Sequence, residues 1–337
     1  MADIRPFCAV RPSVELADKI AALPYDVYNR EEAVKIVKEN PLSFLKIDRA
    51  ETNFDDSVST YADEVYAKAK ELIETMIAEG QFVEDTDRCY YIYRLTMNGR
   101  AQSGIVACSS IDDYCNNVIM KHENTREEKE VDRIRHIDTT SCQTGPIFLA
   151  FRDVATINAI MKEEQAKAPL YCFTADDGIE HCVWKISDEQ NNANLQAAFS
   201  MMDKIYIADG HHRCASAVKV GLQRRKEGVV QESDYFLSVL FPESELKIMD
   251  YNRVLKDLNG KTVKEILSEV EEHFEVEEAD EAISPAKKGE FGMLLDDKWY
   301  KLTIKEEYMS DDAVEGLDVS LLQDYVLDPI FGIKNPK

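Results

Sequence analysis

The sequence predicts a mixed α+β fold, with helices over residues 1–85 and alternating strands and helices after them. The dipeptide Asn98-Gly99 separates two runs suited to strands, and both central positions of a type I′ hairpin turn need positive φ. Further along, an apolar stretch at 204–208 leads directly into Asp209-Gly210, and apolar residues then recur at helical spacing. These patterns predict a hairpin and a strand–turn–helix unit in one chain.

Helices are expected after an extended, proline-punctuated segment that ends near Asp26. The first begins at Asn29 and ends before Pro41, because Asn29 with Glu32 three residues later is typical of a helix start. A longer helix is predicted over 57–80, where Tyr61, Val65, Leu72 and Met76 recur on one face and Gly80 suits the C-terminal cap.

The middle and the end of the chain alternate between the two kinds of element. Thr125 and Glu128 have the spacing of a capping box, which predicts a helix with Val131, Ile134 and Ile137 facing inward. The remaining expected elements are a strand at 146–151, a helix at 154–166, a hairpin of 170–174 and 180–186, strands at 235–241 and 246–251, a helix opened by Thr262 and Glu265, a hairpin of 292–295 and 299–304, and a helix at 319–326.

Composition narrows the possible functions. With 64 acidic and 40 basic residues among 337, the net charge is -24, which repels a phosphate backbone and argues against nucleic acid as a partner. An anionic ligand therefore needs a local cluster of donors. No apolar run has the length of a secretory signal or a membrane span, so we expect a cytoplasmic protein without membrane contact. The eight cysteines show no zinc-ligand spacing and predict reduced, buried thiols.

The strongest candidate site is the run Asp209, Gly210, His211, His212 and Arg213 at the predicted strand-to-helix turn. A helix N-terminus presents unpaired N–H groups, Gly210 permits close backbone approach, and the guanidinium of Arg213 matches phosphate oxygens. Successive residues at a helix start point about 100° apart, so the two histidines are poor chelators of one ion and no metal site is expected. The alternative is that Asp209 only caps the helix.

A second candidate site is Lys121-His122-Glu123, just before the predicted helix at Thr125. Glu123 is a candidate general base for a hydroxyl nucleophile, although a solvated acid that complements the helix dipole is the simpler interpretation. Arg133 is a candidate phosphate or substrate ligand, with a solvated polar face as the favoured alternative. Thr144 lies in a small, polar loop that suits a ligand-lining role and an ordinary loop equally.

Several motifs together resemble the bacterial domain-of-unknown-function family 1015. They are Pro24-Tyr25-Asp26-Val27, Asn40-Pro41-Leu42-Ser43-Phe44-Leu45, Lys121-His122-Glu123-Asn124-Thr125, Asp132-Arg133, Gly145-Pro146-Ile147 and Asp209-Gly210-His211-His212-Arg213. The last of them is similar to the phosphate-binding turn of the ParB/sulfiredoxin superfamily, and of free L-serine kinases in particular.

This resemblance implies a ParB/sulfiredoxin-like nucleotide-binding core with an N-terminal helical segment and inserted or appended α/β elements. The boundaries we expect are 1–85 for the helical segment, 86–250 for the catalytic core with an insertion at about 150–203, and 251–337 for a C-terminal α/β segment that is expected to be truncated.

The resemblance also implies a kinase that transfers a phosphoryl group from ATP or ADP, with Mg²⁺, to a small hydroxyl amino acid such as L-serine. The catalytic residues implied are Glu123, His211 and His212. Asp209 to Arg213 would hold the nucleotide, and Lys121, His122, Thr144 and Arg133 the substrate. A phosphoserine phosphatase and a non-catalytic nucleotide-binding regulator are the alternatives, and a homo-oligomer is compatible with each.

Overall fold

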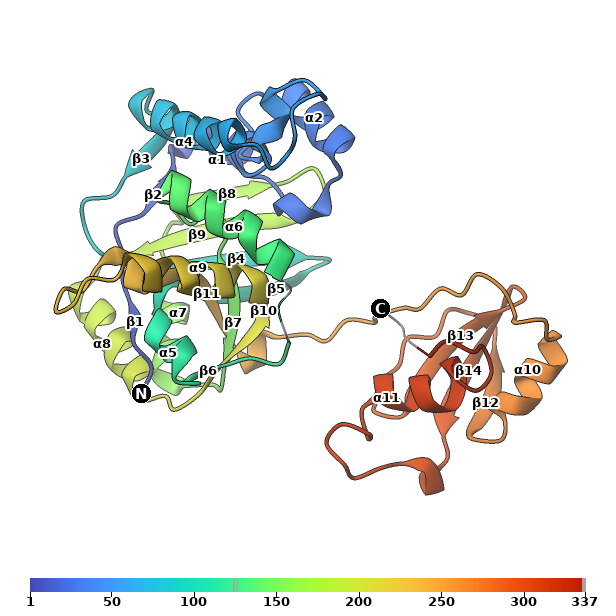
Figure 1. Ribbon diagram of the computed structural model, residues 1–337. Coiled ribbons are helices and arrows are strands. Elements are labelled where there is room, and N and C mark those ends of the chain that lie inside the picture. Colours follow the sequence, from blue (N-terminus) through green and yellow to red (C-terminus); the bar gives the residue numbers. More distant parts are fainter. Residues whose placement is uncertain (124, 126, 335–337) are drawn as a thin grey trace. The chain divides into compact units, whose positions relative to one another are not determined.

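The computed structural model describes residues 1–123, 125 and 127–334 (Figure 1). The chain divides into two compact units, Met1–Leu246 and Lys247–Lys337, each described by itself below. Both combine helices with antiparallel or mixed sheet, so the expected mixed α+β class is confirmed.

A mixed sheet of nine strands forms the centre of the first unit. Its order is β6-β10-β7-β11-β5-β4-β9-β8, and β1 pairs with β5 outside this path. The pairs β6/β10 and β7/β11 are parallel, and the other pairs are antiparallel. The strands are β1 (Ile4–Arg5), β4 (Tyr90–Met97), β5 (Arg100–Ser110), β6 (Ile119–Met120), β7 (Ile147–Phe151), β8 (Tyr171–Thr174), β9 (Glu180–Ile186), β10 (Ile205–Asp209) and β11 (Tyr235–Pro242). A separate two-stranded sheet pairs β2 (Val10–Pro12) with β3 (Phe82–Glu84).

The hairpin of β4 and β5 confirms the strongest turn prediction from the sequence. Asn98 and Gly99 have φ values of 52° and 78°, and Met97 pairs with Arg100 across the turn. Asn and Gly tolerate this left-handed region better than other residues, so the two-residue loop sets the register of both long strands. The strands expected near residues 147–151, 171–174, 180–186 and 235–242 are confirmed as well.

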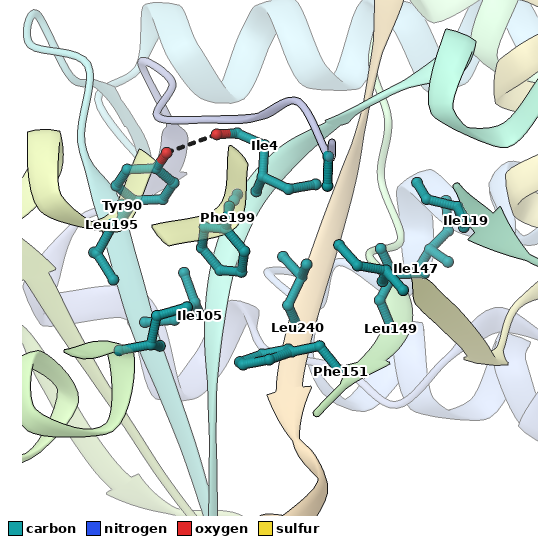
Figure 2. Packing of buried hydrophobic residues seen from close by; sticks show 14 of the residues in the cluster. Ile4, Tyr90, Ile105, Ile119, Ile147, Leu149, Phe151, Leu195, Phe199 and Leu240 are labelled. Atoms are coloured by element: carbon teal, nitrogen blue, oxygen red, sulfur yellow. Dashed lines mark hydrogen bonds between the residues drawn. The ribbon is translucent and has the colours of Figure 1, made fainter. Parts of the chain in front are cut away.

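Apolar side chains from the sheet and its helices form the main core of this unit (Figure 2). Phe151 on β7 packs edge-on against Phe199, with ring centroids 5.6 Å apart. The hydroxyl of the fully buried Tyr90 donates a 2.7 Å hydrogen bond to the backbone oxygen of Ile4, which ties the N-terminal strand to the core. The helices of this unit that cover the sheet are α5 (Ile111–Cys115), α6 (Glu127–Thr140), α7 (Ala155–Gln165), α8 (Glu189–Ser200) and α9 (His211–Arg224).

The N-terminal helices have a small core of their own. They are α1 (Ala17–Ile20), α2 (Arg30–Glu39), α3 (Leu45–Asp48) and α4 (Asp63–Ala78). The helix predicted from Asn29 is confirmed, because Asn29 and Glu32 exchange both hydrogen bonds of a capping box. The helix expected over 57–80 begins only at Asp63, and Tyr61 is 61% exposed rather than part of the apolar face. Turns bonded by Asp55 and Ser59 occupy the segment before it.

Helix α6 differs from its prediction in the side that it buries. Val131, expected to face inward, is 49% exposed, whereas Arg133 and His136 are buried. The solvated polar face favoured for Arg133 is therefore wrong. The reason is that α6 packs against α4 and α9, where its polar side chains find hydrogen-bond partners. The hydroxyl of Tyr66 on α4, for example, donates to Asp132 at 2.7 Å. The capping box predicted between Thr125 and Glu128 lies outside the described residues.

The second unit contains a three-stranded antiparallel sheet in the order β12-β14-β13 with helices beside it. Its elements are α10 (Val263–Val270), β12 (Phe274–Ala279), β13 (Glu290–Leu295), β14 (Lys298–Ile304), α11 (Asp318–Leu322) and a π-helical turn (Gln323–Leu327). The cap at Thr262 and the hairpin at Asp296-Asp297 are confirmed. The strand predicted at 246–251 is wrong, since Ile248 is 97% exposed and nothing pairs with this segment in the described structure.

Two further observations concern the whole chain. In the described residues, no helix is both long and apolar enough to cross a membrane. Cys172 and Cys182 lie opposite each other on β8 and β9 and form a disulfide, which corrects the expectation of reduced thiols for this pair. Cross-strand register places the two residues together although ten positions separate them.

Candidate functional site at the N-terminus of α9

The chain turns sharply from β10 into α9 at Gly210. This residue has a φ of 91°, a left-handed conformation that favours glycine, and it is the N-cap of the helix. The first hydrogen bond of the helix joins Cys214 N to Gly210 O at 2.9 Å. The N–H groups of His211, His212 and Arg213 precede this bond and face out of the helix end, where they can bind an anion.

Asp209 does not cap the helix, so the simpler interpretation of this residue is not supported. No side-chain cap is present in α9; the carboxylate of Asp209 instead accepts a 2.8 Å ion-paired hydrogen bond from Nη2 of Arg213. Nη1 of Arg213 donates to the backbone oxygen of Pro146 at 2.9 Å. The guanidinium thus lies across Gly210, where an added Cβ would meet it at 3.2 Å. The structure holds the cation of Arg213 beside the turn.

Glu123, from the second motif, lies at this same helix end. Its carboxylate is 3.6 Å from Nδ1 of His211, and the ring of His122 meets that of His211 edge-on with centroids 4.4 Å apart. The backbone N–H of His122 points to Nε2 of His211 at 3.5 Å, which favours the tautomer with the proton on Nδ1, toward Glu123. Two motifs far apart in the sequence therefore form one cluster.

The histidine at the centre of this cluster is buried, while the carboxylate is open to solvent. His211 is 5% exposed, and the side chain of Glu123 is 62% exposed. Burial lowers the pKa of His211, the neighbouring His122 lowers it further, and Glu123 partly opposes them. A neutral His211 at pH 7 can donate its Nδ1 proton, and an exposed Glu123 can take a proton from a bound hydroxyl.

Two other predicted site residues point elsewhere. Nζ of Lys121 lies over the ring of Tyr114, 4.0 Å from its centroid, and donates to the backbone oxygen of Tyr114 at 3.3 Å. Nδ1 of His212 is buried and has no hydrogen-bond partner among the described residues. Consecutive helical positions diverge by about 100°, so only the first of the two histidines reaches Glu123.

Arg133 and Thr144 meet on a small pocket beside Arg213. This pocket is lined by Tyr25, Asp48, Arg133, His136, Thr144, Gly145 and Arg213, among others. Oγ1 of Thr144 donates to Asp48 at 2.5 Å, and the guanidinium of Arg133 lies 4.0 Å above the ring of Tyr25. Arg133 and Thr144 thus share a pocket with Arg213, the last residue of the Asp209–Arg213 turn.

Sequence reasoning missed Tyr25, Asp48 and His136 as pocket residues. Tyr25 belongs to the 3₁₀-helix η2 (Tyr25–Val27), and Asp48 ends α3. Tyr25 belongs to one of the motifs that carry the family resemblance, and Asp48 follows another. Only the family resemblance of these motifs pointed to them, because no local sequence pattern tells which side chain of a turn will face a pocket.

The cluster at α9 could also hold a metal ion. Donor atoms of His122, Glu123 and His211 all lie within 4.8 Å of one another. The set combines His211 with two residues from another segment, His122 and Glu123. The expectation of no metal site considered only the adjacent pair His211 and His212, whose side chains diverge. Two imidazoles and one carboxylate suit a transition metal better than Mg²⁺, which prefers oxygen ligands.

The fold and the site define an α+β protein with an acid–histidine cluster beside a helix N-terminus that has no side-chain cap. The chain belongs to the family described as "Protein of unknown function (DUF1015)", whose model matches residues 4–320. No curated protein and no solved structure matches the chain.

Proposed function

We propose that the protein is a small-molecule kinase that transfers a phosphoryl group from ATP or ADP to the hydroxyl of a free amino acid, with L-serine as the proposed acceptor. The observation that supports this most is the position of the Glu123 carboxylate, 3.6 Å from His211 at the N-terminus of α9. A candidate base and a helix end suited to phosphate are two of the elements that catalyse phosphoryl transfer to an alcohol.

In this proposal, the N–H groups of the first turn of α9 and the guanidinium of Arg213 bind the nucleotide phosphates. Glu123 accepts the proton of the substrate hydroxyl as its oxygen forms a bond to the terminal phosphorus. The bond from that phosphorus to the bridging oxygen breaks, and its electron pair leaves with the shortened nucleotide. His211, the histidine that reaches Glu123, would donate a hydrogen bond to the transferred group.

The same turn offers oxygen ligands that fit a nucleotide-bound Mg²⁺. The side chain of Asp209 is 71% exposed, so its carboxylate is accessible to the ion. Bound with the nucleotide, Mg²⁺ would neutralise phosphate charge. We place the site in a ParB/sulfiredoxin-like nucleotide-binding core, as the likeness of the Asp209–Arg213 turn implies.

The test is incubation with L-serine, MgCl₂ and either ATP or ADP, followed by ³¹P NMR and mass spectrometry for O-phosphoserine. Threonine and homoserine serve as alternative acceptors. The absence of product with both nucleotides and all acceptors contradicts the proposal. Phosphate release from O-phosphoserine without nucleotide would indicate a phosphatase, and tight nucleotide binding without product a regulatory protein.

A further inference from the structure

Opposite charges face the pocket beside Arg213 without pairing with each other. Arg133 comes from α6 and Asp48 from α3, and both line the pocket. No ion pair joins them in the part of the chain that the structure describes; Arg133 pairs with Asp132 at 2.8 Å instead. Burial opposes the charge of Arg133, but Asp132 and, to a smaller extent, Asp48 raise its pKa. Space between a cation and a carboxylate that do not pair with each other suits a ligand that carries both charges.

Arg133 forms the positive pole. Its side chain is only 10% exposed, with Nε donating to Asp132 at 2.9 Å and one face covered by Tyr25. Among residues 1–123, 125 and 127–334, Nη1 makes no hydrogen bond. A largely buried guanidinium with a donor left over suits a carboxylate, because most of its desolvation cost is already met in the folded protein. Burial and the charge of Arg133 lower the pKa of neighbouring His136, which leaves that ring neutral at pH 7.

Asp48 forms the negative pole. One carboxylate oxygen accepts the 2.5 Å hydrogen bond from Thr144, and no Lys, Arg or His of the described chain makes an ion pair with Asp48. The other oxygen can accept from an ammonium group. Gly145 and Arg213 complete the pocket on the side of the phosphate-binding turn, where Nη1 of Arg213 would lie 3.4 Å from a Cβ at Gly145.

We infer that this pocket recognises the backbone of a free α-amino acid, with its carboxylate on Arg133 and its ammonium group on Asp48 beside Thr144. The side chain of the amino acid then extends toward Arg213 and the turn. The assignment rests on the proposed function in one respect: the hydroxyl of the bound amino acid is the group that is phosphorylated. Binding of the amino acid itself requires no nucleotide. It excludes peptides and N-blocked amino acids as substrates, since neither carries a free ammonium group and a free carboxylate on the same α-carbon.

Isothermal titration calorimetry without nucleotide tests the assignment with three ligands of nearly equal size. L-serine carries both charges, L-glycerate lacks the ammonium group, and serinol lacks the carboxylate. We expect L-serine to bind about 10- to 100-fold more tightly than either analogue, the usual worth of one charge-assisted hydrogen bond. Equal affinity for the three ligands, or no binding of L-serine, overturns the assignment.

Two variants identify the poles. In Asp48→Asn, L-serine should no longer bind more tightly than glycerate, but it should still bind more tightly than serinol. In Arg133→Lys, only the difference in affinity between L-serine and serinol should become smaller. Asp63→Asn and Arg135→Lys are the matched controls, because these residues pair with each other on the exposed surface beside the same helix. Thermal unfolding checks that each variant is folded. Ligand preferences that stay unchanged in folded Asp48→Asn contradict the assignment.

Failure of this inference is distinguishable from failure of the kinase proposal. If serine binding depends on Asp48 but no phosphoryl transfer occurs, the pocket assignment is supported and the kinase proposal is rejected. If phosphoserine forms and the KM for L-serine is unchanged in Asp48→Asn, the kinase proposal is supported and the pocket assignment is rejected.

Discussion

The carboxylate of Glu123 and Nδ1 of His211 lie 3.6 Å apart at the N-terminus of α9. Strand β6, which precedes Glu123, pairs with β10, which precedes His211, through the register Ile119 to Ile205. The parallel pairing of two short strands thus brings both motifs to the same end of the sheet. Their meeting point is a helix end suited to phosphate.

Removing the proposed base tests the chemistry directly. Glu123→Gln keeps the size of the side chain but cannot accept a proton, so phosphoserine formation should fall by about 10²- to 10⁴-fold. ADP affinity, measured by calorimetry, should change little or increase. Glu163→Gln is the control, since Glu163 is a similarly exposed acid on α7. Full activity in Glu123→Gln would assign the proton transfer to another group.

Arg213→Ala tests the anion site. Loss of one charge-assisted contact should weaken ADP or inorganic phosphate binding by about 10- to 100-fold. The free energy of unfolding should change by about 1 kcal/mol or less, because Asp209, the ion-pair partner, is 71% exposed and stays solvated when the pair is lost. Arg224→Ala, in the last turn of α9 and paired with Asp138, provides the comparison. Loss of the fold with unchanged affinity per folded molecule would give Arg213 a structural role only.

Gly210→Ala separates backbone strain from the function of the turn. A Cβ at φ 91° costs about 1–2 kcal/mol of stability, and here it also meets the Arg213 guanidinium at 3.2 Å. Gly178→Ala imposes a similar φ of 80° in the β8–β9 turn, where nothing lies within 4 Å. Urea denaturation should show a loss of stability in both variants, whereas calorimetry should show weaker ADP binding in Gly210→Ala alone. A parallel loss of affinity in both would refute the special role of Gly210.

Acid stability should depend on Asp85. Burial opposes its ionisation, but hydrogen bonds from Arg11, Tyr91 and Lys185 outweigh burial and lower its pKa to about 2. An unfolded Asp titrates near pH 4, so the ionised carboxylate stabilises the fold fully above about pH 4, and this contribution is lost as pH falls toward 2.

Urea titrations between pH 5 and 2 measure this effect. In Asp85→Asn the free energy of unfolding should be lower at pH 5 and should decline less steeply toward pH 2 than in the wild type. Asp56→Asn, which alters a 97% exposed side chain, should follow the wild-type curve. Identical slopes in Asp85→Asn and wild type would exclude Asp85 as a source of acid sensitivity.

Features decided within a few residues could be predicted from the sequence. The Asn98-Gly99 turn, the caps at Asn29 and Thr262, and the glycine turn into α9 all follow from allowed φ values and local hydrogen bonds. The Asp209–Arg213 run could be singled out because its chemistry depends on one helix end.

Other features depended on what packs against each element. The sequence of α6 does not show that Arg133 and His136 are buried while Val131 is exposed, because polar partners from the N-terminal helices and α9 make that burial favourable. The pocket between Arg133 and Asp48 and the contact of Glu123 with His211 likewise join segments distant in the chain. Local propensities set turns and caps, whereas only the tertiary structure decides which charges are desolvated together, since desolvation depends on every neighbour in space.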